Sequence, residues 1–112
     1  MAELRIDDDF LTVELSAAEK VECLHGDLVV PRSAVASARA VLDGTAEVHG
    51  LRAPGTGLPG VILAGTFRDG GSRTFAVCHH RRPAVVLELD GQSFDRVVVT
   101  VEDPQAVVDR LG

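Results

Sequence analysis

The sequence predicts a mainly β domain with helices, of the α+β class, built on antiparallel strands. Apolar and polar residues alternate over most segments that lie between Gly, Pro and Asp turn signals. A capping box early in the chain predicts a short helix after the first hairpin, and an N-cap followed by proline predicts a closing helix. The length of 112 residues fits a single domain over residues 1–112.

The first hairpin is predicted from two alternating segments, 4–6 and 11–15, on either side of the acidic turn 7–9. Its buried face would carry Leu11, Val13 and Leu15, which alternate with polar residues. The hairpin would therefore contribute one apolar face to the core.

A helix over 16–24 follows, because Ser16 and Glu19 have the spacing of a capping box. Residues 28–30 read as a short strand that Pro31 closes. The segment 35–42 stays open between helix and strand, since its alanines permit a helix while the flanking pattern suits a strand.

The second half predicts four more strands, joined as an antiparallel meander after a loop over 49–60 that is dense in Gly and Pro. A closing helix begins with Asp103 as N-cap and Pro104 at its first position. The alternating residues of the four strands, in chain order, are Val61, Leu63 and Phe67; Phe75, Val77 and His79; Val85, Leu87 and Leu89; and Val97, Val99 and Val101.

Composition narrows the function classes. The net charge of −6 opposes general attraction to nucleic acid or to anionic lipid, and the absence of Trp and Tyr removes base-stacking platforms. No signal peptide and no apolar run long enough to span a membrane are visible, so we expect a cytoplasmic protein and no integral membrane protein. Cys23 and Cys78 are then expected to be small buried apolar residues, not a disulfide.

The loop residues Gly55 to Gly60 match the pattern G-x-G-x-x-G, but their context does not fit a dinucleotide site. That site needs a helix N-terminus after the glycines, whereas here Pro59 removes an amide and a strand pattern follows. The loop could instead only route the chain, or it could hold an anion. Candidate ligand-binding residues for an anion are Arg52, Gly55, Thr56, Gly57, Arg81 and Arg82.

Metal binding and catalysis lack a pattern of their own. Cys78 and His80 would share one face of a strand, yet no paired ligand spacing supplies two more ligands, so we predict no metal and no cofactor. The serines and aspartates fall largely at caps and turns, and no nucleophile elbow occurs. We therefore assign no catalytic residue, and an enzyme ranks third among the functions considered.

The pattern as a whole resembles small actinobacterial proteins with a bacterial pleckstrin-homology-like fold, a family without an assigned activity. The resemblance implies a bent antiparallel barrel or sandwich of about seven strands with a C-terminal capping helix. Two features depart from the lipid-binding relatives, namely the acidic first hairpin and the extra helix over 16–24. The segments that carry the resemblance are 26–31, 33–35, 52–60, 82–86 and 97–104.

The leading functional hypothesis is a non-catalytic binding or assembly module that contacts a protein, a peptide or further copies of itself. An exposed sheet edge would allow β-augmentation, and the Gly/Pro loop is the other candidate surface. The alternative is a small protein that binds an anionic ligand through the loop and the nearby arginines.

Overall fold

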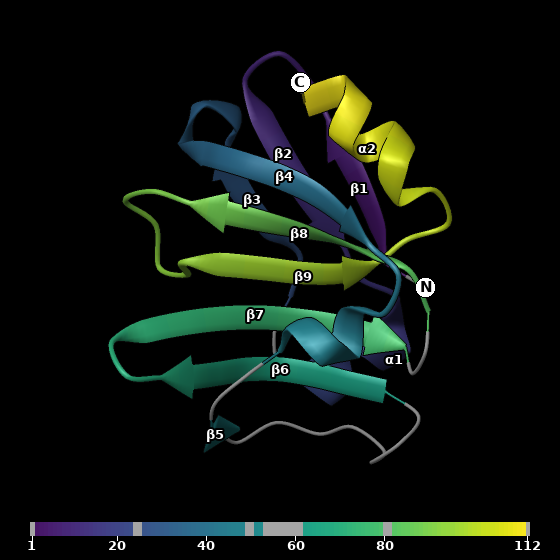
Figure 1. Cartoon of the computed structure of the whole chain (residues 1–112), viewed down its shortest axis with the longest axis vertical. Coiled ribbons are helices and arrows are strands. Elements are labelled where there is room, and N and C mark those ends of the chain that lie inside the picture. The colour runs from purple at the N-terminus through teal and green to yellow at the C-terminus, as the bar shows by residue number, and fades with distance from the viewer. Residues whose placement is uncertain (1, 24–25, 49–50, 53–61, 80–81, 112) are drawn as a thin grey trace.

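The computed structural model describes residues 2–23, 26–48, 51–52, 62–79 and 82–111. Within them the strands form two sheets (Figure 1). The smaller sheet has the order β1-β2-β3, from β1 (Glu3–Ile6), β2 (Phe10–Glu14) and β3 (Leu28–Pro31). The larger sheet has the order β4-β8-β9-β7-β6-β5, from β4 (Val35–Val41), β5 (Leu51–Arg52), β6 (Ile62–Asp69), β7 (Ser72–His79), β8 (Ala84–Leu89) and β9 (Arg96–Thr100). The helices are α1 (Ala17–Cys23) and α2 (Pro104–Leu111), with 3₁₀ turns η1 (Arg32–Ala34) and η2 (Gly44–Glu47).

The predicted first hairpin is confirmed as the antiparallel pair β1 and β2. Its turn is held by the Asp7 carboxylate, which accepts hydrogen bonds from the backbone amides of Phe10 at 2.7 Å and Asp9 at 2.9 Å. These bonds favour the ionised form and lower the pKa of Asp7 below its usual value. The acidic residues of this segment therefore serve the turn itself.

The capping box is also confirmed, at the start of α1. The Ser16 hydroxyl accepts a hydrogen bond from the Glu19 amide at 3.2 Å, and the Glu19 carboxylate accepts one from the Ser16 amide at 2.8 Å. Reciprocal capping supplies partners for amides that the first turn of a short helix would otherwise leave unpaired.

The expected meander of the last four strands is wrong in one pairing. Strands β6 and β7 form one hairpin and β8 and β9 another, but β9 pairs with β7 in parallel and β8 lies beyond it. Every side chain from Val97 to Thr100 is buried, as expected for a central strand covered on both faces. Alternation alone could not identify the neighbour, because a strand that is buried on both faces fits either order.

The open segment 35–42 is resolved as strand β4, which pairs with β8 at one edge of the larger sheet. The described strands number nine, against about seven expected, and they do not close into a barrel. The mainly β architecture with an early helix and a closing helix is thus confirmed, whereas the closed form of the sheet is not.

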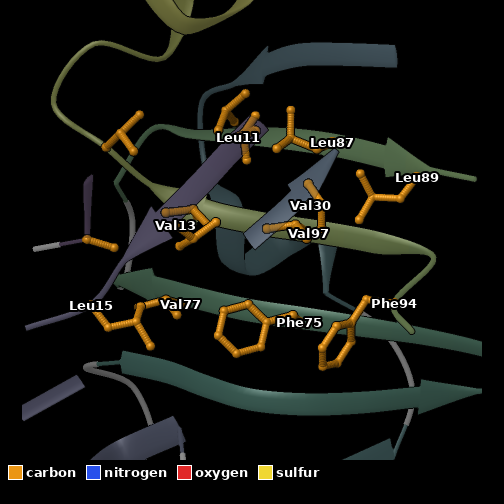
Figure 2. Close-up of a cluster of buried hydrophobic side chains, with 14 of the residues drawn as sticks. Leu11, Val13, Leu15, Val30, Phe75, Val77, Leu87, Leu89, Phe94 and Val97 are labelled. Atoms are coloured by element: carbon orange, nitrogen blue, oxygen red, sulfur yellow. The ribbon is translucent and has the colours of Figure 1, made fainter. Parts of the chain in front are cut away.

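The main core lies between the two sheets (Figure 2). Phe75 of the larger sheet is fully buried and its ring lies 5.3 Å from that of Phe94, while Leu11 and Val13 enter from the smaller sheet. A second buried cluster covers the other face of the larger sheet, under η2, and contains Phe67, Ala76, Cys78, Ala84, Val86 and Val98. The predicted inward faces of β2, β8 and β9 all belong to the main core.

Candidate functional site

Strand β4 is an edge strand whose second edge is unpaired among the strands that the structure describes. In Figure 1 it borders the larger sheet on the side where α2 lies. An edge strand presents unpaired amides and carbonyls, which can pair with another extended chain. The β4 edge is therefore a surface on which a further strand can be added.

Small side chains and a bulge shape this edge. The register with β8 shifts between Val35 and Ser37, so that Ala36 is the extra residue. Val35 and Ala38 consequently both pack against the main core, while Ala36 and Ser37 remain exposed. A partner chain would meet little steric hindrance along this part of the strand.

Helix α2 faces β4 and is anchored to the core and to the first hairpin. Its N-cap Asp103 accepts a hydrogen bond from the Ala106 amide at 3.2 Å, and the side chains that touch the core are Val107, Val108 and Leu111. Near its other end, Arg110 donates to the Ile6 carbonyl at 3.1 Å.

The guanidinium of Arg32 links the same end of α2 to the hairpin. It donates to the Arg110 carbonyl at 2.8 Å and to the Asp7 carbonyl at 3.1 Å. Arg32 thus supplies a partner for a carbonyl in the last turn of α2, one of the groups that a helix cannot pair internally. The two arginines hold the helix at a fixed position beside β4.

A groove of about 300 Å³ lies between β4 and α2. No charged side chain lines it, and its volume is at the lower end for sites that hold a small ligand or a side chain. We call this surface the β4–α2 groove, and its lining residues are Val35, Ala36, Ser37, Ala38, Val108 and Leu111.

The cation on β4 itself is held on the other face of the sheet. Arg39 donates to the Glu47 carboxylate of η2 at 3.1 Å, and this hydrogen bond raises the pKa of Arg39 above its usual value. Its guanidinium is therefore engaged in a contact with η2, outside the groove lining.

Of the residues predicted to bind an anion, only Arg82 is described with its side chain. It is exposed, its amide donates to the His79 carbonyl at 3.3 Å, and it borders a recess of about 370 Å³ together with Pro83, Thr100, Val101 and Glu102. The backbone of Arg52 pairs with Phe67 in β5, and the side chain of Arg52 lies outside the described part. Gly55, Thr56, Gly57 and Arg81 also lie outside the described residues, so the anion site stays a prediction.

Sequence reasoning missed a pairing between Glu19 of α1 and His79 of β7. Glu19 is only 3% exposed, and its second carboxylate oxygen lies 3.8 Å from Nε2 of His79. Within the described part of the chain neither of these two atoms has a hydrogen-bond partner. No sequence signal could have found this pair, because each residue already had a local explanation and 60 positions separate them.

The thiol of Cys78 is buried in the second cluster, where it donates to the Val98 carbonyl at 3.4 Å. Among the described residues no group of three or more His, Cys, Asp or Glu side chains is placed to hold a metal ion. His80, the second residue of the weighed metal pair, lies outside the described residues. Cys78 fits the expected part of a small buried apolar side chain.

No described helix is both long and apolar enough to cross a membrane. Comparisons of the chain with protein-family models, curated proteins and solved structures found no match. The β4–α2 groove is therefore interpreted from its own geometry.

Proposed function

We propose that this protein is a non-catalytic binding module that takes up an extended segment of a partner protein along β4, in the β4–α2 groove. The observation that carries the proposal is the coincidence of an unpaired strand edge with an apolar groove beside it. Either feature alone would be weaker support, because edge strands and shallow grooves are both common.

Strand addition divides recognition between backbone and side chains. Backbone hydrogen bonds to the edge supply affinity without regard to sequence, while a pocket that receives alternate side chains supplies selectivity. Here the edge of β4 would pair with the partner backbone, and the space before Val108 and Leu111 would receive one apolar side chain.

A fixed groove also lowers the cost of binding. The contacts of Arg32 and Arg110 hold α2 against the first hairpin, so the helix need not be ordered when the partner arrives. Preorganised walls reduce the entropy lost on association.

The resemblance to the pleckstrin-homology-like family belongs to this proposal. The paired sheets and the C-terminal helix support it, and the parallel pairing of β7 and β9 counts against it. The cytoplasmic location expected from the sequence likewise stays a prediction.

The proposal is tested with a phage-displayed library of random 12-mer peptides, selected on wild-type protein and on the variant Ala36→Arg. Ala36 is exposed and lines the groove, so a long cationic side chain there fills it without altering the core. The matched control is Ala40→Arg, because Ala40 is exposed on the same strand but does not line the groove. We expect peptides that bind the wild type and the control at least tenfold more tightly than Ala36→Arg.

Chemical-shift mapping of the best peptide provides the second measurement. The largest shifts are expected at amides of β4 and α2. Equal binding to Ala36→Arg, shifts centred on other elements, or failure to enrich any peptide over an empty support would each overturn the proposal.

A further inference from the structure

The charges around the β4–α2 groove point to the chemistry of its occupant. Two exposed carboxylates stand at its rim, on different elements. Asp90 follows β8, and its amide donates to the carbonyl of Ala34 at 2.9 Å, directly before the groove residue Val35. Asp109 follows the groove residue Val108 on α2 and accepts a hydrogen bond from the Gln105 amide at 3.0 Å.

The basic side chains near the groove are already engaged within the chain. On η1, β4 and α2 these are Arg32, Arg39 and Arg110, and each donates to a carbonyl or carboxylate of this protein. Arg32 and Arg110 also lie next to the acidic turn 7–9, which offsets their charge. The groove surroundings are thus left with an excess of negative charge.

The last turn of α2 adds to this field. Val108 and Leu111 belong to the C-terminal half of the helix, where the macrodipole places partial negative charge on carbonyls without intrahelical partners. Only an incoming cation or hydrogen-bond donor matches this end of the groove.

From this complementarity we infer that the groove selects extended segments in which a lysine or arginine lies next to the apolar residue that enters it. The inference rests on the proposed function. The apolar lining receives the side chain, and the carboxylates of Asp90 and Asp109 contact the neighbouring cation at the rim.

The test uses the consensus peptide from the library selection, labelled with a fluorophore, in anisotropy titrations at low and high salt. We expect basic residues to be enriched beside the apolar anchor. Exposed charge pairs are individually weak, so the double variant Asp90→Asn/Asp109→Asn should lower affinity roughly tenfold at low salt and much less at high salt. A peptide with the basic residue replaced by glutamine should lose a similar factor.

The control variant Glu3→Gln removes one negative charge at the end of β1 opposite Ile6, away from the residues that line the groove. It should bind like the wild type. If peptides bind in the groove without basic enrichment, or if the double variant binds like Glu3→Gln, the inference on charge is overturned while the proposed function stands.

A second copy of the chain would be a different occupant. Light scattering that shows a dimer which Ala36→Arg dissociates would overturn the inference, because the groove would then be filled by β4 of another copy. Failure to select any peptide that depends on Ala36 would instead remove the proposed function itself.

Discussion

The carboxylate of Glu19 takes part in two interactions that use different oxygen atoms. One oxygen closes the capping box with the Ser16 amide, and the other faces the imidazole of His79 across the gap between α1 and β7. The first contact holds the helix start, while the second links the helix to the larger sheet. The side chain of His79 is 34% exposed, so water weakens this second contact.

Two substitutions separate these contacts. Glu19→Ala removes both and should lower the free energy of unfolding by about 1–2 kcal/mol, the range for loss of a cap. Glu19→Gln keeps the cap, since glutamine is also a capping-box residue, and removes only the charge, so it should cost less than half as much. Urea denaturation measures both values, and equal losses would show that the contact with His79 outweighs the cap.

At the same scale, the capping box was predictable because it is a contact between residues three apart. The turn residue Asp7 belongs to the same class, since its partners Asp9 and Phe10 are two and three positions away. The neighbour of Glu19 on β7 was not predictable, because only the tertiary fold brings it there. Local chemistry could therefore be read from the sequence, and contacts that depend on packing could not.

Among the elements, η2 shows how closely a short 3₁₀ turn packs on the outer face of the larger sheet. A Cβ atom at Gly44 would lie 2.6 Å from Cβ of Ala84 and 3.2 Å from Sγ of Cys78. The first distance is too short for two carbon atoms, and Ala84 cannot turn aside because its Cβ is fixed by the backbone. Only glycine fits at this position without moving η2 or β8.

Gly44→Ala should therefore destabilise the protein by about 1–3 kcal/mol through overpacking. The matched control is Gly71→Ala in the turn between β6 and β7, where an added Cβ would have no atom within 4 Å. Thermal unfolding of the two variants checks this: a fall in Tm for Gly44→Ala should exceed that of the control severalfold. A larger fall for Gly71→Ala would contradict the close approach at Gly44.

Elements were predictable where one face is buried and the other is wet, as in β2 with its buried Leu11 and Val13. Prediction failed where that contrast is lost. In β4 small residues and a bulge obscure the alternation, so the segment stayed undecided between helix and strand. In β9 both faces are buried, so Val97, Val98 and Val99 indicate a central strand without indicating its neighbours. The groove was missed for the same reason, since it exists only once β4 and α2 are placed together.

Across the whole molecule, a shared core joins the two sheets. Phe75 from β7 and Leu11 from β2 are both buried in it, so neither sheet covers its apolar face without the other. The smaller sheet has only three short strands, too few to be stable alone without an apolar partner surface. The two sheets should therefore unfold together.

Phe75→Ala tests this coupling, because it removes a large buried side chain from the larger sheet alone. We expect a loss of about 3–5 kcal/mol in the free energy of unfolding. In native-state hydrogen exchange the amides of β2 should lose as much protection as those of β7, although the substitution lies in the other sheet. As a control, Thr12→Ala in β2 changes a half-buried residue and should leave both sheets largely protected. If Phe75→Ala weakens β7 while β2 keeps its protection, the sheets are separate folding units, and the anchoring of α2 to the first hairpin by Arg32 and Arg110 would no longer hold the groove in place.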